Sequence, residues 1–294
     1  MKKVIIIYGP TAVGKSGIAI ELAKLIDGEI ISADSMQIYK HLNIGSAKVT
    51  PCEMQGIPHY LIDIKEPNED YSVAEFVSDA NYYIDKIISN NKTPIIVGGT
   101  GLYIKGLISN YSFGNSAKNV ELRQSLDNLT TEELYNTACS FGGNINVDKN
   151  NRRRLIRYIE KQTNGNFVNN NSVNIKYPYL LFGICDDRQL IYDRINSRVN
   201  KMVDDGLIDE LNQLLSIKGI ENSLCMKAIG YKELIPYVNG EATLNDCLNI
   251  LKQKTRNYAK RQITYMNQFD NIIKINFCGT IETSKKIYEY IHSK

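Results

Sequence analysis

The run from Val4 to Tyr8 is apolar or aromatic throughout, and it leads directly into Gly-Pro-Thr-Ala-Val-Gly-Lys-Ser at residues 9–16. A strand, a glycine-rich loop and a helix start in this order are typical of a phosphate-binding P-loop. Gly9 and Gly14 allow backbone angles that are closed to other residues, so successive amide groups can turn inward and cradle phosphate oxygens. The segment therefore predicts a strand, loop and helix that together hold a polyphosphate.

The loop residues have separate tasks in binding an anion. Lys15 supplies a point charge to the distal phosphates, the Ser16 hydroxyl is a ligand for Mg²⁺, and the helix that follows directs its positive end at the anion. The candidate diphosphate- or nucleotide-binding residues are Gly9, Pro10, Thr11, Ala12, Val13, Gly14, Lys15 and Ser16. The loop alone leaves open whether the phosphate is transferred, hydrolysed or expelled as a leaving group.

Composition narrows the class of protein. A chain of 294 residues with 43% hydrophobic content is long enough for one or two globular domains. The net charge of +3 is modest, so affinity for nucleic acid must come from local patches. The six cysteines stand far apart without a Cys-x-x-Cys pair, which predicts free thiols, mostly buried. The N-terminal apolar run ends at Tyr8 and no membrane span is visible, so a cytoplasmic location is expected.

Strand and helix patterns alternate through about the first hundred residues, as in a doubly wound parallel sheet. Strands are expected at residues 4–8, 29–34, 59–64, 94–97, 179–184 and 271–276, with a capped helix after Ser72. From about Tyr111 to Lys176 strand patterns are missing. Two helical segments are expected there, near 119–140 and 150–162, followed by an asparagine-rich loop at 164–174.

The predicted fold class is therefore α/β, a P-loop NTPase-like parallel sheet core that carries an inserted all-helical domain. The first part of the core is expected at residues 1–112 and the helical insertion at 113–176. The core continues at 177–294, where it is mostly helical and contains a basic C-terminal helix. The insertion is expected to interrupt one sheet domain rather than follow it.

Polar residues stand at the carboxyl ends of the predicted strands, the edge of a parallel sheet where ligands react. Asp34, in Asp-Ser-Met-Gln, can hold Mg²⁺, accept a proton or cap the next turn. Asp63 is either a water-mediated metal ligand or a turn carboxylate. In Gly-Gly-Thr-Gly at residues 98–101, the glycines bring backbone close to a bound group and leave the Thr100 hydroxyl exposed, although a tight strand-to-helix turn would have the same composition.

Basic residues cluster in three places. Arg152 to Arg154, with Arg157 and Lys161, give the insertion a positive surface or an ordinary solvated face. A second cluster consists of Lys252, Lys254, Arg256, Lys260 and Arg261, with Tyr258 and Tyr265 beside it. No acidic residue lies between 252 and 269, and a basic helix with aromatic side chains suits a nucleic acid. Arg194, Arg198 and Lys201 share one helix face and are either diphosphate ligands or a solvated stripe.

Six segments together resemble one enzyme family, the tRNA dimethylallyltransferases, also called tRNA isopentenyltransferases, in their bacterial form. They are residues 9–16, Ile-Ser-Ala-Asp-Ser-Met-Gln at 31–37, Asn-Ile-Gly-Ser-Ala-Lys at 43–48, Val-Gly-Gly-Thr-Gly-Leu-Tyr at 97–103, Ala-Ile-Gly-Tyr-Lys-Glu at 228–233 and Thr-Arg-Asn-Tyr-Ala-Lys-Arg-Gln-Ile-Thr at 255–264. The resemblance runs in order through nearly the whole chain. It implies transfer of a dimethylallyl group from its diphosphate to N6 of the adenosine 3′ of the anticodon, position 37 of tRNA. Mg²⁺, expected from the Ser16 ligand of the P-loop, is the predicted cofactor.

The resemblance also assigns roles to residues. Asp34 would accept a proton from the adenine amine, Arg198 would clamp the diphosphate, and Thr11 and Thr100 would orient phosphate and base. The anticodon stem-loop would contact Asp34, Ser35, Met36, Gln37, Thr100, Arg123, Arg153, Arg154, Leu155, Ile156, Arg157, Arg256, Lys260 and Arg261. The chain departs from the family pattern at Lys149-Asn-Asn151, where Pro-Asn-Asp is usual, and at Tyr265, where tryptophan is usual. The zinc finger of eukaryotic relatives is missing, so no zinc partner is expected.

Two other functions compete with this one. A P-loop kinase or an adenylate isopentenyltransferase acting on a free nucleotide would explain the loop, but it would leave the basic clusters without a role. A noncatalytic RNA-binding ATPase would explain both features, and it predicts ATP turnover without prenyl transfer.

Overall fold

The computed structural model describes residues 3–109, 120–142, 145, 147–163 and 177–293. Its contacts divide the chain into two units. We call them the core unit, Met1–Ile108 with Ile175–Lys294, and the helical unit, Ser109–Asn174. The predicted domain boundaries, after residues 112 and 176, fall at positions outside the described residues.

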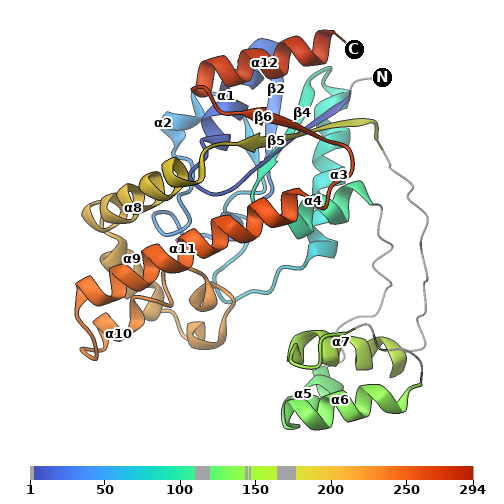
Figure 1. The fold of residues 1–294 in the computed structure, drawn as a ribbon, viewed down its shortest axis with the longest axis vertical. Coiled ribbons are helices and arrows are strands. Elements are labelled where there is room, and N and C mark those ends of the chain that lie inside the picture. Colours follow the sequence, from blue (N-terminus) through green and yellow to red (C-terminus); the bar gives the residue numbers. More distant parts are fainter. Residues whose placement is uncertain (1–2, 110–119, 143–144, 146, 164–176, 294) are drawn as a thin grey trace. The chain divides into compact units, whose positions relative to one another are not determined.

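A six-stranded sheet forms the centre of the core unit, with strand order β3-β2-β4-β1-β5-β6 (Figure 1). The strands are β1 (Val4–Tyr8), β2 (Gly28–Ser32), β3 (His59–Tyr60), β4 (Thr93–Gly98), β5 (Tyr179–Cys185) and β6 (Ile272–Asn276). Every pairing is parallel, and Ile5 of β1 lies opposite Ile95 on one side and Leu180 on the other. The α/β fold class is confirmed. Because β5 pairs with β1 across the inserted segment, one sheet is built from both parts of the core.

Helices cover both faces of the sheet (Figure 1). The alternation of β1 sends Ile5 and Ile7 toward α1 and α12, whereas Ile6 and Tyr8 face the opposite layer, which includes α3, α4, α9 and α11. The helices of the core unit are α1 (Lys15–Ile26), α2 (Pro51–Met54), α3 (Val73–Ser89), α4 (Gly101–Ile108), α8 (Arg188–Asp204), α9 (Leu207–Leu215), α10 (Ile235–Val238), α11 (Leu244–Met266) and α12 (Thr280–His292), with 3₁₀ turns η1 (Ile220–Asn222) and η2 (Cys225–Lys227).

The third strand is shorter than its apolar pattern predicts. It was expected at 59–64 but ends at Tyr60, because Leu61 and Asp63 have φ angles of 61° and 55°. These left-handed conformations cannot continue an extended strand. The chain instead turns back toward the loop that follows β2, where Ile64 donates a backbone hydrogen bond to Ile38.

Three helices form the described part of the helical unit: α5 (Val120–Asp127), α6 (Thr131–Ser140) and α7 (Arg152–Thr163). The single helix predicted at 119–140 is wrong, because Thr130 caps a new helix. Its side chain accepts from the Glu133 amide, and the Glu133 carboxylate accepts from the Thr130 amide, which is a capping box. The predicted asparagine-rich loop at 164–174 lies outside the described residues.

Two general expectations can be compared with the described residues. No helix among them is long and apolar enough to cross a membrane. All six cysteines are free, as expected, but only Cys225 and Cys247 are buried, so the prediction that the thiols are mostly buried was wrong.

Candidate active site

The ends of four parallel strands bring the candidate residues to one edge of the sheet. The P-loop follows β1, Asp34 follows β2, the Gly-Gly-Thr-Gly turn follows β4, and Asp186 follows β5. Since parallel strands end at the same edge, segments that are far apart in sequence meet there.

The P-loop has a backbone conformation suited to an anion cradle. Ala12 and Gly14 have φ angles of 63° and 92°, in the left-handed region that turns amide groups inward. The Lys15 ammonium group donates a 2.7 Å hydrogen bond to the Pro10 carbonyl oxygen, which holds the side chain along the loop. Ser16 lies exposed in the first turn of α1, at the positive end of the helix.

Burial is the main cause that lowers the pKa of Lys15 to about 7; the Asp34 carboxylate opposes this shift and the Arg198 guanidinium adds to it. Lys15 is therefore a desolvated cation whose charge is incompletely compensated. An anion that enters the loop would stabilise the protonated form.

Asp34 fills one of the roles left open by the sequence, that of a turn cap. Its carboxylate accepts a 2.9 Å hydrogen bond from the Met36 amide, so it caps the local turn. Burial raises its pKa, which makes it a stronger base, while backbone hydrogen bonds and the Lys15 charge oppose that shift. The carboxylate is thus held in place by the backbone next to the phosphate cradle.

The three basic residues that share one face of α8 have different surroundings. Arg198 is partly buried, and burial lowers its pKa while its charge acts on Lys15. Arg194 pairs with Asp186, donates a 3.4 Å hydrogen bond to the Ala12 carbonyl oxygen, and lies over the Phe277 ring. Arg194 therefore supports the loop. Lys201 forms an exposed pair with Asp205, so the solvated alternative describes it best.

The Gly-Gly-Thr-Gly segment is both a tight turn and part of the site. A Cβ atom on Gly98 would lie 2.1 Å from the Ala33 carbonyl oxygen, so only glycine permits this approach of β4 to the residue before Asp34. Thr100 accepts a 3.1 Å hydrogen bond from the Ser35 amide. The Thr100 hydroxyl is consequently joined to the Asp-Ser-Met-Gln segment.

Sequence reasoning missed the roles of two residues on α11. Gln262 is 4% exposed and touches both the P-loop and the Gly-Gly-Thr-Gly turn through its side-chain amide. Tyr258 interacts with Thr100, Gln262 and Asp34, and burial raises its pKa, so its hydroxyl stays protonated. A signal for Gln262 was available, because it occupies an inward position three residues after the buried Ala259 and four before the buried Met266.

Asp63, the second candidate carboxylate, is held by an ion pair within the core unit. Asp63 forms an ion pair with Lys48, whose ammonium group also donates 2.8 Å to the Tyr39 carbonyl oxygen. This contact favours the turn carboxylate over the metal ligand. The loop at 43–48 is held by buried Glu210, whose carboxylate accepts from the amides of Asn43, Ile44 and Gly45.

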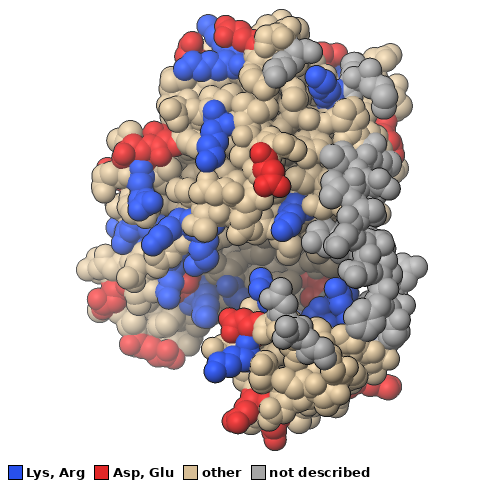
Figure 2. Space-filling view, turned by 45° about the vertical axis from the view of Figure 1, so that its right-hand side comes forward, with Lys and Arg blue, Asp and Glu red and all other residues tan. Residues whose placement is uncertain are grey.

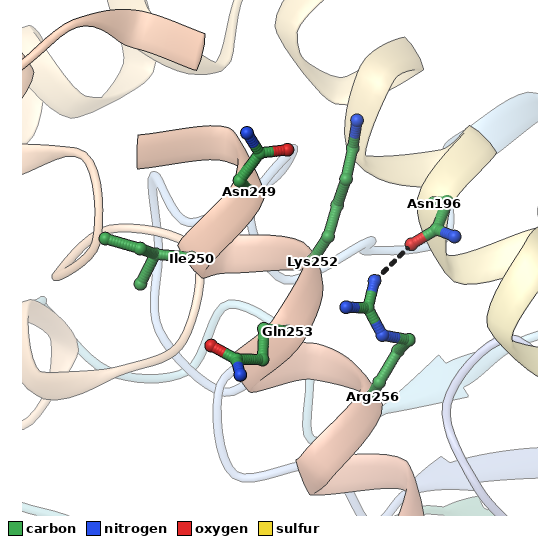
Figure 3. Close-up of a pocket in the computed structure, with 6 residues that line it drawn as sticks. All are labelled: Asn196, Asn249, Ile250, Lys252, Gln253 and Arg256. Carbon is green, nitrogen blue, oxygen red and sulfur yellow. Dashed lines mark hydrogen bonds between the residues drawn. The ribbon is translucent and has the colours of Figure 1, made fainter. Parts of the chain in front are cut away.

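Basic side chains of α11 border an open groove beside α8. Figure 3 shows Lys252 and Arg256 projecting into this space, and Arg256 donates a 2.7 Å hydrogen bond to Asn196. The groove has a volume of about 490 Å³ and is lined by Asn196, Asn249, Ile250, Lys252, Gln253 and Arg256. Lys260 and Arg261 are exposed on the same helix. Several Lys and Arg side chains gather on the left of the core unit in Figure 2.

In the helical unit, the predicted RNA-contacting residues separate into two groups. Arg123 and Arg157 pair with the buried Glu160. Leu155 and Ile156 lie in the apolar core of this unit, so their side chains support α7 rather than form a surface. Arg153 and Arg154 are exposed.

At the two departures from the family pattern, Asn151 and Tyr265 each contact a neighbouring part of the chain. Asn151 accepts a 3.2 Å hydrogen bond from the Arg154 amide through its side chain and so helps to begin α7. Tyr265 packs against the Gly-Gly-Thr-Gly turn, where a Cβ atom on Gly101 would lie 2.2 Å from its ring. Tyr265 therefore helps to fix the same turn that carries Thr100.

Comparisons with known proteins decide the family. A family model described as IPP transferase matches residues 37–269. The chain belongs to this family. It is 44% identical over 282 residues to the tRNA dimethylallyltransferase of Alkaliphilus oremlandii, covering 92% of this chain and 90% of the relative. It is 42% identical over 301 residues to that of Alkaliphilus metalliredigens, covering 99% and 96%. The resemblance stated from the motifs is confirmed.

Solved structures agree with this assignment. The chain is similar to the tRNA isopentenylpyrophosphate transferase of Bacillus halodurans, with a TM-score of 0.77, 36% identity and coverage of 100% of this chain and 96% of that one. A eukaryotic dimethylallyltransferase, described as acting on tRNA, matches with a TM-score of 0.85 at 26% identity, covering 100% of this chain and 80% of that one. The P-loop precedes the range matched by the family model but lies within the region covered by these structures.

Proposed function

We propose that this chain transfers a dimethylallyl group from dimethylallyl diphosphate to N6 of the adenosine 3′ of the anticodon in tRNA, producing N6-isopentenyladenosine and diphosphate. The observation that carries the proposal is that the P-loop with Lys15 and the Asp34 carboxylate follow two strands at the same edge of one parallel sheet, in a member of the IPP transferase family. A cationic cradle beside a carboxylate suits a reaction that expels an anion and removes a proton.

The cradle stabilises the leaving group. As the allylic carbon–oxygen bond breaks, negative charge grows on the diphosphate, and the Lys15 ammonium and Arg198 guanidinium groups would interact with it. Fixed donors of this kind stabilise developing charge more effectively than water does, because they need no reorganisation. The P-loop amides between Ala12 and Ser16 add further donors.

The Asp34 carboxylate would accept the proton that N6 releases when its new bond forms. N6 of the adenine forms a bond to the allylic carbon, the carbon–oxygen bond electrons leave with the diphosphate, and an N6 proton passes to Asp34. The raised pKa of Asp34 favours this acceptance. Because the N6 lone pair is delocalised into the ring, alignment of the base matters as much as basicity. The Thr100 hydroxyl, which accepts a hydrogen bond from the Ser35 amide, would orient the base.

We also propose that Mg²⁺ binds with the diphosphate. The described residues contain no cluster of three His, Cys, Asp or Glu side chains that could hold a metal ion. The exposed Ser16 hydroxyl is a hard oxygen ligand that fits Mg²⁺, whose other ligands would be diphosphate oxygens and water. The ion would neutralise part of the diphosphate charge.

The RNA surface that we propose includes the α11 groove with Lys252 and Arg256, the exposed Lys260 and Arg261, and the exposed Arg153 and Arg154 of the helical unit. These cations suit a phosphate backbone. The target base must leave its stack to reach Asp34, which costs roughly a few kcal/mol and less in a flexible loop.

The test is a transfer assay with labelled dimethylallyl diphosphate, Mg²⁺ and either unmodified tRNA transcript or AMP. We expect label in tRNA at one adenosine next to the anticodon, located by nuclease digestion and mass spectrometry, and none with Lys15→Ala. Label in AMP instead would favour the free-nucleotide enzyme. Steady, tRNA-stimulated phosphate release from ATP without label in RNA would favour the RNA-binding ATPase.

A further inference from the structure

One side chain joins the two halves of the candidate site. The Gln262 amide oxygen accepts a 2.8 Å hydrogen bond from the Thr11 amide of the P-loop, and its amide nitrogen donates 2.9 Å to the Gly99 carbonyl oxygen. Both hydrogen bonds are buried or partly buried. The P-loop carries the proposed diphosphate ligands, whereas Gly99 immediately precedes Thr100, the residue proposed to orient the base.

We propose that Gln262 is a positioning residue that sets the alignment of the diphosphate cradle with the base-orienting turn. We call the two hydrogen bonds of the Gln262 amide the clamp. The inference rests on the proposed function, since it assigns the Thr11 side of the clamp to the diphosphate and the Gly99 side to the base. No substrate contact is required of Gln262 itself.

Only a primary amide of this length satisfies both partners. The Thr11 partner is a donor and the Gly99 partner is an acceptor, so the clamp needs an acceptor and a donor on one planar group, which glutamine provides. A glutamate keeps the acceptor but loses the donor, and methionine has neither. Gly99 is matched to the clamp, because a Cβ atom there would lie 2.2 Å from the Gln262 amide nitrogen.

The backbone of the same residue is also held. The Tyr8 hydroxyl, at the end of β1, donates a 3.1 Å hydrogen bond to the Gln262 carbonyl oxygen. The Tyr258 side chain, one helical turn earlier, interacts with both Gln262 and Thr100. These contacts fix Gln262 relative to β1, so the amide is preorganised rather than free to follow the loop.

The clamp lies on the helix that carries exposed cations. Lys260 and Arg261 directly precede Gln262, and they are exposed whereas Gln262 is buried. A helix that would bind RNA on its outer face therefore holds the phosphate loop with its inner face. The position of α11 would therefore determine the alignment of both substrates.

The test compares Gln262→Met with Gln268→Met, a control glutamine that is exposed just beyond the end of α11. Transfer to tRNA, tRNA affinity, inorganic pyrophosphate affinity and thermal unfolding are measured for each full-length variant. For Gln262→Met we expect kcat to fall roughly 10- to 100-fold, as for a small misplacement of reacting groups. We expect pyrophosphate to bind several-fold more weakly, because the variant loses the hydrogen bond to the P-loop as well as the one to Gly99. We expect tRNA affinity to stay within about twofold, because the exposed Lys260 and Arg261 are unchanged.

Two further variants keep the proposal testable if Gln262→Met does not fold. Gln262→Glu retains the Thr11 hydrogen bond, and Gly99→Ala displaces the amide without changing Gln262. Both should lower kcat at nearly unchanged tRNA affinity. A stability loss with wild-type kcat and pyrophosphate affinity, in any variant that folds, would overturn the proposal and leave a purely structural role.

The pyrophosphate measurement needs no RNA. If the wild-type protein transfers nothing to tRNA, the proposed function fails, yet the comparison of pyrophosphate affinities still decides whether Gln262 positions the loop. Combining Gln262→Met with Thr100→Ala adds a check on alignment. The double variant should lose less activity than the product of the single losses, since both act through the same geometry.

Discussion

Partly buried charged residues of the core unit and the buried Glu160 of the helical unit differ in how far their charges are compensated. In the core unit, Lys15, Asp34 and Arg198 come from three separate chain segments, and burial is the largest cause of each pKa shift. In the helical unit, burial also raises the pKa of Glu160, but hydrogen bonds from Arg123 and Arg157 outweigh it and hold that pKa below its usual value.

This difference in charge compensation separates residues available for chemistry from residues that hold the fold together. A buried carboxylate that receives two guanidinium groups has its charge compensated within the protein, so it holds helices together. A partly buried lysine whose charge is only partly compensated remains available to an incoming anion. Both groups combine a carboxylate with two cations, and the hydrogen-bond partners inside the protein decide which role each residue takes.

The largest expected effect is a loss of transfer rate, and it tests the catalytic role proposed for the core-unit residues. Asp34→Asn removes the proposed proton acceptor and keeps the shape, so the transfer rate should fall by about 10²- to 10⁴-fold, the usual contribution of a general base. Single-turnover transfer to tRNA measures it. Asp63→Asn is the matched control, because Asp63 pairs with Lys48. Full activity of Asp34→Asn would exclude Asp34 as the base.

A second substitution tests the structural role of Glu160, because Glu160→Gln should destabilise the helical unit. The amide cannot compensate Arg123 and Arg157 as the carboxylate does, and we expect a loss of about 1–3 kcal/mol. Hydrogen exchange of residues 120–163 in the full-length protein measures the local effect. Protection of α5 to α7 equal to that of the wild type would show that the pairs contribute little.

The incomplete compensation of Lys15 predicts proton uptake. With a pKa of about 7, Lys15 is protonated below that pH and largely neutral above it. A bound anion favours the protonated form, so pyrophosphate binding should take up as much as about one proton more at pH 8 than at pH 6. Calorimetry in buffers of different ionisation enthalpy measures the uptake. In Lys15→Met only the titration of pyrophosphate itself should remain, and an unchanged uptake would contradict the assignment.

The smallest effect concerns the exposed arginines. Arg153→Ala and Arg154→Ala should leave stability unchanged and weaken tRNA binding a few-fold. The slope of log affinity against log salt concentration should become shallower by about one unit for each phosphate that is no longer neutralised. Filter binding at several salt concentrations measures this. A salt dependence equal to that of the wild type would remove these residues from the RNA surface.

Much of the core could be predicted because its patterns are local. The P-loop, the strand runs and Asp34 each lie within a few consecutive residues, so spacing and polarity were sufficient. The capping box between Thr130 and Glu133 was equally local but was overlooked, and one predicted helix became two.

The sequence by itself therefore determined the α/β class, the position of the glycine-rich loop between β1 and α1, and the family, since these follow from short motifs in a fixed order. Only the tertiary structure decided which arginines Glu160 holds, that Leu155 and Ile156 are buried, and that Gln262 clamps the site. Gln262 meets Thr11 across 251 positions of sequence and Gly99 across 163. Burial and hydrogen-bond partners at such separations depend on how the whole chain packs, and no local pattern encodes them.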